Sequence, residues 1–473
     1  MNDDLWTAYE AAAATGGALC ARGDGASWPA EEWAARGVSI DTRNIKPGEL
    51  FVALRDQRDG HEFVRNAFGA GAAAALVSRA PDDAPAGAPL LVVGDTLQGL
   101  RDLAVAARMR NFGKRIAVTG SAGKTSTKEM LRDLLGAQCQ VHAAERSFNN
   151  HWGVPLTLAQ LPMRSEYSVF EIGMNHAGEI TPLSKLVRPH AAIVTTVAPA
   201  HLAAFKDVSE IAEAKAEIFL GLAPGGVAIL PLDNEHYPLL RDRAERAGAA
   251  CAITFGESSE ADFQLESHEP SESGAVLSIR IFGKRHKVEF GLAGRHQACN
   301  ALAALAAAHS VGADIEAALG VMPSIQPVDG RGALAEVPVG DGKAILVDES
   351  YNANPASMHA ALEAFASTPA KRRIIVLGEM LELGPRSAEF HAALGRDINV
   401  MDIDRIYAVG GLMEELWTVT NKDRRAAFAK SADHLINAVI DDIRAGDAIM
   451  VKGSNGSKVS LIAKAIRLLA EGK

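Results

Sequence analysis

The 473-residue chain is poor in three things: aromatic residues, cysteine and long hydrophobic runs. Aromatic residues make up 5% of the sequence, which disfavours recognition of single-stranded nucleic acid through stacked bases. The four cysteines lie far apart and form no CxxC pair, so the sequence predicts free thiols in a reducing compartment rather than a disulfide framework or a zinc site. No run of about 18 apolar residues occurs, and we therefore expect no membrane span.

The chain also has fewer basic than acidic residues: 48 Lys and Arg against 58 Asp and Glu, which gives a formal net charge of −10. A general nucleic-acid binder needs a basic face, so this balance argues against one. An anionic small substrate stays possible, since a few local Lys and Arg side chains can hold phosphate inside an acidic protein. The first residues, MNDDLWTAYEAAAATGG, lack the basic region and apolar core of a signal peptide, and we expect a cytoplasmic protein.

Three α/β domains are predicted from the order of the apolar segments. Residues 1–112 mix short strands and helices. In residues 113–322, four strand-like segments are each followed by a polar or helical stretch, which predicts a parallel sheet covered by helices. A hairpin at residues 275–292 is expected to be inserted before a helix that starts near Gly294. Residues 323–473 carry four more strand candidates, AILVDES, RIIVLGE, RIYAVGG and AIMVKGS.

The stretch TGSAGKTSTKEM, residues 119–130, has the composition of a phosphate-binding loop. The apolar strand RIAV precedes it and an apolar helical stripe follows, and this geometry aims backbone N–H groups and a helix N-terminus at phosphate. Two residues separate Gly120 from Gly123, where the common P-loop leaves four. The alternative is a glycine-containing loop with an exposed lysine. The context favours a nucleotide site built from Gly120, Ser121, Ala122, Gly123, Lys124, Thr125 and Ser126.

Several other polar residues have both a functional and a structural interpretation on residue pattern alone. Glu171 follows the strand YSVF, at the end where open α/β sheets place ligands, but it could equally be a helix cap or a surface acid. A lone histidine such as His201 is more often structural, and Mg²⁺ prefers oxygen ligands. The spacing around Lys215 favours a solvated helix lysine. His296 and Asn300 are four residues apart and would share one face of a helix.

The shortened loop TGSAGKTS resembles the ATP-binding loop of the Mur ligases, the ATP-dependent amide-forming enzymes of peptidoglycan precursor synthesis. Other stretches resemble the same family in its own order: SFNNHWGVPLTL, EIGMNHAGEI, APAHLAAF, AKAEIF, GRHQACNALAALA, DGRG, DESYNANPASMHAAL and LGEMLELG. The resemblance therefore runs through all three domains. It implies the three-domain Mur ligase architecture, with a central P-loop ATPase domain on a parallel sheet and a C-terminal Rossmann-like domain.

Within the family, YNANP together with ELG resembles the member that joins D-alanyl-D-alanine to UDP-MurNAc-tripeptide. The resemblance implies ATP and Mg²⁺ as cofactors and an acyl-phosphate route. Lys124 and Thr125 would hold the β- and γ-phosphates and one Mg²⁺. Glu171 and His201 would be metal ligands. Lys215 matches a lysine that is carbamylated in Mur ligases, which turns a cation into an anion that supports Mg²⁺.

Further roles follow from the same resemblance. Asn300 matches an ATP-contacting Asn, Arg331 would bring its guanidinium to the γ-phosphate, and Asp348 matches a ribose or phosphate contact. Asn354 and Pro355 have the pattern of an N-cap and a first helical residue, a structural role that needs no ligand. The candidates for substrate contacts are Asp41 and Arg43 for the uridine nucleotide, Asn149 and Asn150 for the sugar–peptide carboxylate, and Lys452 and Ser454 for the dipeptide carboxylate.

The sequence departs from the family pattern at three places. Thr196 and Glu379 stand where relatives often carry Asn and Asp, and Asn455 stands where an Arg often follows KGS. The last change removes a cation and so weakens the case for dipeptide-carboxylate binding. Two rival functions stay open: another amide ligase of the superfamily, such as a folylpolyglutamate synthetase, and a P-loop regulatory ATPase without a ligation step. We expect a monomer that binds no nucleic acid.

Overall fold

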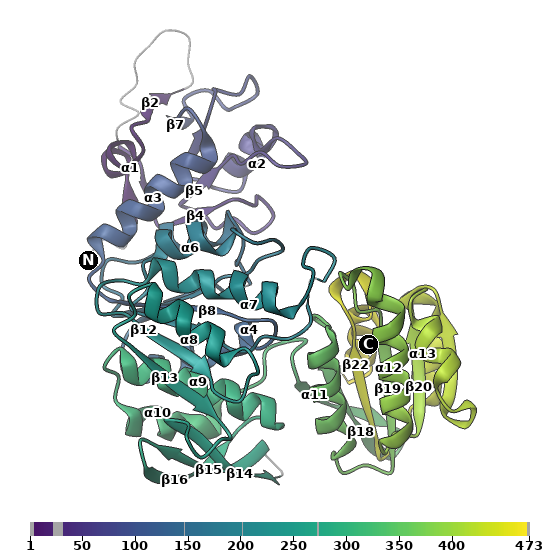
Figure 1. The fold of residues 1–473 in the computed structure, drawn as a ribbon. Coiled ribbons are helices and arrows are strands. Elements are labelled where there is room, and N and C mark those ends of the chain that lie inside the picture. Colours follow the sequence, from purple (N-terminus) through teal and green to yellow (C-terminus); the bar gives the residue numbers. More distant parts are fainter. Residues whose placement is uncertain (1–3, 22–31, 146, 201, 272–273, 471–473) are drawn as a thin grey trace.

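The computed structural model describes residues 4–21, 32–145, 147–200, 202–271 and 274–470. Three mixed sheets of five, nine and six strands, together with a small two-stranded sheet, organise these residues. Figure 1 shows the N-terminal part at one end of the central part and the C-terminal part at its side, each with helices against its sheet. The predicted α/β class with three sheet-based units is confirmed.

The N-terminal sheet has the strand order β2–β7–β6–β5–β4. Its four strands β4 to β7 are parallel and β2 is antiparallel, and the apolar segments GELFVAL and PLLVV contain β5 and β7. The strands are β2 (Ala18–Ala21), β4 (Gly37–Ser39), β5 (Glu49–Val52), β6 (Ala74–Val77) and β7 (Pro89–Val92), with β1 (Trp6–Thr7) and β3 (Ala34–Ala35) paired separately. The helices are α1 (Ala8–Thr15), α2 (Val64–Gly69) and α3 (Thr96–Arg110).

The central sheet has the order β16–β15–β14–β13–β12–β11–β8–β10–β9 and is parallel from β9 to β14. The predicted hairpin at residues 275–292 is β15 and β16, which extend the sheet at one edge. The strands are β8 (Lys114–Thr119), β9 (Val141–Ala143), β10 (Tyr167–Glu171), β11 (Ala191–Val194), β12 (Val227–Pro231), β13 (Cys251–Gly256), β14 (Phe263–Ser271), β15 (Gly274–Ile281) and β16 (Lys284–Phe290). The helices are α4 (Lys124–Gly136), α5 (Gly153–Ala159), α6 (Ile180–Val187), α7 (Val208–Ala216), α8 (Tyr237–Arg246), α9 (Arg295–Ser310) and α10 (Ile315–Val321).

The N-terminal and central parts share one hydrophobic core. Buried residues of both, from Trp6 and Leu103 to Val154 and Phe170, form a single cluster. The Trp6 indole N–H also donates to the carbonyl of Ala159, at 2.9 Å. Burial of so much apolar surface stabilises the relative placement of these two parts, because non-polar area removed from water is the main favourable contribution to packing.

The C-terminal sheet has the order β17–β18–β22–β19–β20–β21 and is parallel except for β17. The four predicted strands are β18, β19, β20 and β22, whereas the edge strands β17 and β21 were not predicted. The strands are β17 (Ala333–Val339), β18 (Gly342–Glu349), β19 (Arg372–Gly378), β20 (Arg405–Val409), β21 (Arg425–Ala429) and β22 (Asp447–Lys452). The helices are α11 (Pro355–Ala366), α12 (Ser387–Val400), α13 (Met413–Val419), α14 (Ile436–Asp442) and α15 (Ser460–Ala470). Separate apolar clusters fill its two faces.

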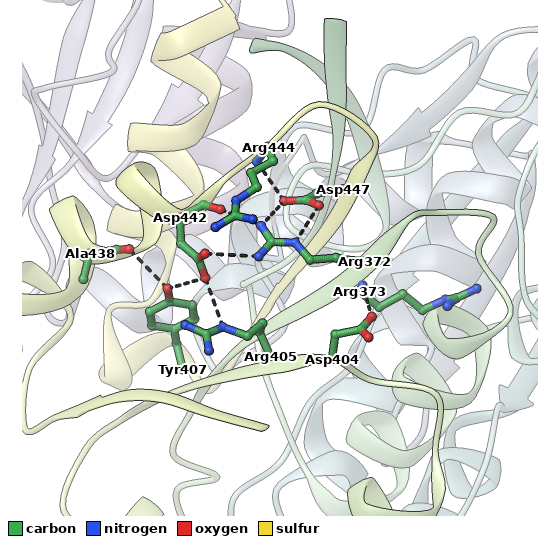
Figure 2. A network of polar contacts seen from close by, with 9 residues as sticks. All are labelled: Arg372, Arg373, Asp404, Arg405, Tyr407, Ala438, Asp442, Arg444 and Asp447. Atoms are coloured by element: carbon green, nitrogen blue, oxygen red, sulfur yellow. Dashed lines mark hydrogen bonds and ion pairs between the residues drawn. The ribbon is translucent and has the colours of Figure 1, made fainter. Parts of the chain in front are cut away.

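A network of ion pairs and hydrogen bonds connects side chains at the amino-terminal ends of β19, β20 and β22 (Figure 2). Arg372 donates two bonds to the buried Asp447, at 3.0 and 2.6 Å, and a third to Asp442 at 3.2 Å. Asp442 also accepts from Arg405 at 3.2 Å and from the Tyr407 hydroxyl at 2.9 Å. Burial opposes ionisation of Asp442, but the bonds from Tyr407 and Arg372 outweigh it and lower the pKa of this carboxyl. We call these five residues the β19 network.

Candidate active site

The loop between β8 and α4 needs glycine at two positions. Gly120 has φ +154° and Gly123 has φ +82°, conformations that residues with a side chain rarely adopt. A Cβ on Gly120 would lie 1.8 Å from Thr195 Oγ1, and one on Gly123 would lie 2.4 Å from Asn300 Oδ1. Gly123 is the N-cap of α4 and supplies no side-chain cap to that helix. The loop therefore has the strand, tight turn and open helix N-terminus that bind phosphate in other proteins.

Lys124 is the first residue of α4 and its side chain folds back over the loop. Its Nζ donates to the carbonyl of Gly120 at 2.7 Å. Burial lowers the pKa of Lys124, the negative charge of Glu171 opposes that shift, and the positive charge of Arg331 adds to it. A carboxylate from β10 and a guanidinium from the C-terminal part thus act electrostatically on the same ammonium group.

Glu171 is the last residue of β10 and is 3% exposed. Its Oε2 accepts from the Thr125 hydroxyl at 2.7 Å, and its Oε1 accepts from Asn149 Nδ2 at 2.8 Å. The Thr125 hydroxyl also lies 3.0 Å from the Ser147 hydroxyl. A carboxylate beside a hydroxyl is a donor set that suits a hard cation such as Mg²⁺. The described residues contain no group of three or more His, Cys, Asp or Glu arranged to hold a metal, so the hydroxyl and a bound ligand's oxygens would have to complete the site.

Lys215 lies in the last turn of α7 and is 2% exposed, so the alternative of a solvated helix lysine is wrong. Within the described chain no hydrogen bond or ion pair reaches its ammonium group. The flanking acids are engaged elsewhere, Glu213 with Arg243 and Glu217 with the backbone of residues 178 and 181. Burial, and after it the charge of Lys124, holds the pKa of Lys215 well below its usual value. His201 lies outside the described residues.

Two cations of the C-terminal part are partnered in different ways. The Arg331 guanidinium carbon lies 4.2 Å from the centroid of the Tyr351 ring, a cation–π contact, while its Nε is buried without a hydrogen-bond partner among the described residues. Lys452 ends β22, is 2% exposed, and donates to Glu349 Oε2 at 3.2 Å and to the carbonyl of Asn352 at 3.1 Å. Arg331 thus keeps hydrogen-bonding capacity that Lys452 has already used.

A cavity of about 720 Å³ lies between the central and C-terminal parts. The predicted site residues that line it are Ser121, Ala122, Gly123, Lys124, Thr125, Ser126, Asn149, Glu171, His296, Asn300, Arg331, Lys452 and Ser454. The structure therefore brings together, in one space, residues that the sequence spreads over more than 330 positions. Lys215 and Gly120 do not line the cavity, but both interact with Lys124, which does. The charge of Lys124 helps to lower the pKa of Lys215, and the Lys124 ammonium group donates a hydrogen bond to the carbonyl of Gly120.

Other predicted residues lie apart from this cavity. Asp41 and Arg43 bind each other through a bidentate ion pair with a shortest distance of 2.7 Å, and the bonds from Arg43 lower the pKa of Asp41. Asn150 Oδ1 accepts from the backbone N–H of Gly153 at 2.8 Å, at the start of α5. Their predicted substrate contacts stay predictions.

Asp348 is also engaged within the C-terminal part. Its carboxylate accepts from the Ser350 hydroxyl at 2.6 Å and pairs with Arg467 of α15 at 2.8 Å. It is 5% exposed and does not line the cavity, whereas its neighbour Glu349 does. At the end of β18 it is thus Glu349 that lines the cavity, in agreement with the alternation of side chains along a strand, and the predicted ribose or phosphate contact of Asp348 stays a prediction.

Sequence reasoning also missed cavity residues that the same strand-end rule could have found. Asp233 and Asn234 follow β12, and Asn234 Nδ2 donates to the carbonyl of Val197 at 2.9 Å. Ser147 follows β9 and lies beside Thr125. All three residues follow strands whose neighbours in the sheet carry predicted site residues, as expected for a site at the carboxyl ends of parallel strands.

Comparisons with known proteins agree with this architecture. Residues 118–308 match the model of the Mur ligase middle domain, and residues 336–455 match that of the Mur ligase glutamate ligase domain. The UDP-N-acetylmuramoyl-tripeptide–D-alanyl-D-alanine ligase of Bacillus subtilis (strain 168) is 36% identical over 441 residues, which cover 92% of this chain and 93% of that enzyme.

Two solved structures extend the likeness to the whole fold. The crystal structure of MurF from Acinetobacter baumannii has a TM-score of 0.83 and 30% identity, with 98% of this chain and 99% of that one covered. MurF ligase from Thermotoga maritima in complex with ADP has a TM-score of 0.78 and 26% identity, with 92% and 98% covered. No helix among the described residues is long and apolar enough to span a bilayer. On these grounds the chain belongs to the Mur ligase family.

Proposed function

We propose that this chain is the ATP-dependent ligase that joins D-alanyl-D-alanine to UDP-MurNAc-tripeptide in peptidoglycan precursor synthesis. The observation that carries the proposal is the cavity between the central and C-terminal parts, where a phosphate loop faces Arg331 and Lys452 across one space. The activity comes from the likeness to ligases of that name, which extends over about nine-tenths of both chains. The four cysteines are all unpaired, which supports action in the reducing cytoplasm, and we expect a monomer.

The reaction needs a carboxylate to become an electrophile. A carboxylate oxygen of the sugar peptide attacks the γ-phosphorus of ATP, and the bond from that phosphorus to the bridging β–γ oxygen breaks. The products are ADP and the acyl phosphate of the sugar peptide. The dipeptide nitrogen then attacks the carbonyl carbon and loses a proton, and the carbon–oxygen bond to phosphate breaks. Positioning two anions against each other is the main difficulty, so charge neutralisation and orientation are the protein's tasks.

Residues of the central part would hold the phosphates. The open N-terminus of α4 and the Lys124 ammonium supply donors and positive charge, and Asn300, beside Gly123 in the structure, would contact the nucleotide. Thr125, Glu171 and His201 are the proposed Mg²⁺ ligands. When bound, Mg²⁺ would neutralise charge between the γ-phosphate and the carboxylate.

Lys215 is proposed to act as a carbamate. Its burial without a partner among the described residues and its lowered pKa favour the neutral amine, which is the form that adds CO₂. Addition of CO₂ to this amine, with loss of a proton, would give an anion that can pair with Mg²⁺ and with Lys124. The two cations would compensate the buried negative charge, which is costly without a partner.

The C-terminal part would complete the site. The Nε of Arg331 has no hydrogen-bond partner in the described part of the chain, and Arg331 would approach the γ-phosphate, while Asp348 is proposed for the ribose or a phosphate. Lys452 and Ser454 are the proposed contacts of the dipeptide, and Asn149 and Asn150 those of the sugar–peptide carboxylate. Asp41 and Arg43 are proposed for the uridine nucleotide.

A substrate screen tests the proposal against its rivals. Purified protein is given ATP with paired acceptors and amines, and phosphate release and the mass of the amide product are measured. We expect product from UDP-MurNAc-tripeptide with D-alanyl-D-alanine. Product from a folate and glutamate instead would favour a folylpolyglutamate synthetase. Phosphate release that needs neither partner would favour a regulatory ATPase.

A further inference from the structure

Asn354 connects the C-terminal part of the chain to the phosphate loop. Its side-chain Nδ2 donates to the backbone carbonyl of Ser121 at 3.0 Å, across 233 residues of sequence. Asn354 is 9% exposed and lines the cavity, as Ser121 does. The sequence predicted a cap for α11 at this position and no other role, so this contact is an additional one.

The orientation of the Asn354 amide is fixed by its own helix. Its Oδ1 accepts from the backbone N–H of Ser357 at 2.9 Å, and its backbone N–H donates to the Ser357 hydroxyl at 3.0 Å, which completes a capping box. Because Oδ1 must face an N–H group, Nδ2 is the atom left to face Ser121. One side chain therefore holds the first turn of α11 and the phosphate loop together.

Ser121 is itself held in place by the loop that follows β11. Its backbone N–H donates to the carbonyl of Thr196 at 2.9 Å. Its hydroxyl donates to the carbonyl of Ala198 at 2.9 Å and accepts from the N–H of Ala198 at 3.0 Å. Asn354 thus binds a part of the phosphate loop that is fixed to the central part. If the C-terminal part moved, Ser121 would stay in place and the bond to Asn354 would break.

We propose that Asn354 is a positioning residue for phosphoryl transfer, in addition to its role as a helix cap. It sets the distance between the phosphate loop and the part of the chain that carries Arg331 and Lys452. The kinetic test of this inference rests on the proposed ligase function, because it measures turnover of that reaction. Without the Asn354 bond, the cations of the C-terminal part would meet the phosphates less often, and turnover would fall while substrate binding to the central part persists.

Two substitutions separate positioning from capping. Ser and Asp are both good N-caps, so N354S and N354D keep α11. Neither replaces the bond to Ser121, because an ionised Asp has no hydrogen to donate and the Ser hydroxyl is one atom shorter than the Asn354 amide. Asp additionally brings a negative charge to a phosphate site, which Ser does not. We expect kcat to fall about fivefold or more in both variants, with the KM for the UDP-sugar peptide changed less than twofold.

Hydrogen exchange supplies a readout that does not need catalysis. In the nucleotide-free protein, the peptide covering residues 119–126 should exchange faster in both variants than in the wild type. The control is D314A, which removes the N-cap of α10 outside the cavity and should lower the unfolding temperature without changing kcat or exchange in that peptide.

The proposal is overturned if kcat and exchange at 119–126 in N354S match the wild type. It is equally overturned if only N354D loses activity, because charge would then be the cause, or if the losses match those of D314A at equal loss of stability. If the wild type makes no amide product but exchange responds as expected, the ligase function fails while the structural link between Asn354 and the phosphate loop stands.

Discussion

Charged side chains are paired to different degrees at the two ends of the parallel strands. At the amino-terminal ends of the C-terminal sheet, Arg372 is bonded to Asp447 and Asp442, and Asp442 is bonded to Arg405 as well (Figure 2). Around the cavity, at the carboxyl ends, pairing is incomplete: Lys452 is bonded to Glu349, but the buried Nε of Arg331 has no hydrogen-bond partner among the described residues. Lys215, buried in α7 and subject to the charge of Lys124, is likewise unpaired within the described chain.

The difference indicates what each region is for. A paired network satisfies its own hydrogen bonds and needs nothing from outside. A buried cation without a partner lowers stability, and such residues persist mainly where a ligand or a modification compensates for them. The comparison therefore predicts that substitutions at the cavity change turnover and hardly change stability, whereas substitutions in the β19 network do the reverse.

The largest effect is expected for Lys124→Ala. Loss of the phosphate-facing ammonium should lower ATP turnover at least about a thousandfold, because the transferred group carries concentrated negative charge. The unfolding temperature should stay within a few degrees or rise, since a half-buried cation is removed. Turnover and calorimetric unfolding are measured on the same preparation, with Lys185→Ala, an exposed helix lysine, as the control. Near-normal turnover would show that the loop is not a phosphate site.

Lys215→Arg tests the carbamate. Arg keeps the cation but cannot add CO₂, so turnover should fall by orders of magnitude, as in Lys215→Ala. Small carboxylic acids should partly restore Lys215→Ala by occupying the vacated anion position, and this rescue is measured as a rise in ADP formation with added acid. Lys185→Arg should keep full activity. If Lys215→Arg keeps most of its activity, the carbamate role is wrong.

In the β19 network we expect the reverse pattern. Asp447→Asn should cost about 2 kcal/mol in the free energy of unfolding, because Arg372 loses a buried, bidentate partner. Turnover of the folded enzyme should be unchanged. The matched control is Asp402→Asn: Asp402 pairs with Arg373 but its side chain is 75% exposed, so the cost should stay below about 0.5 kcal/mol. Equal costs in denaturant titrations would contradict the account.

The smallest effect concerns Tyr407 and alkaline pH. Burial, and next the hydrogen bond to Asp442, raise the pKa of Tyr407 to about 12. A tyrosine in the unfolded chain titrates near 10. Its contribution to stability is therefore complete below about pH 10 and is lost as the pH rises toward 12. The difference in unfolding free energy between the wild type and Tyr407→Phe should be flat from pH 7 to 9 and shrink above 10. A flat difference throughout would show that the hydroxyl is not buried against Asp442.

Much of the fold could be predicted because its main signals are local. Apolar strands that alternate with helices marked the parallel sheets, and RIAV before the glycines of residues 120–123 located the phosphate loop. The edge strands β17 and β21 were missed because many of their residues are only half buried, which leaves a weak apolar pattern. The domain boundaries stay predictions.

The site was less predictable where it depends on packing. Lys215 shares a helix face with the buried Ile211, four residues earlier, and this spacing could have indicated burial. No local pattern could have shown that its flanking acids bind elsewhere. The bond between Asn354 and Ser121 joins positions 233 residues apart, and only the folded chain reveals it.

The most direct test of the central claim is ADP formation with each substrate omitted in turn, with hydroxylamine present to trap an acyl phosphate as the hydroxamate. The account predicts that ADP appears only when UDP-MurNAc-tripeptide is present. It also predicts that the sugar-peptide hydroxamate accumulates when D-alanyl-D-alanine is left out. Equal rates of ATP hydrolysis with and without the sugar peptide, and no hydroxamate, would contradict it.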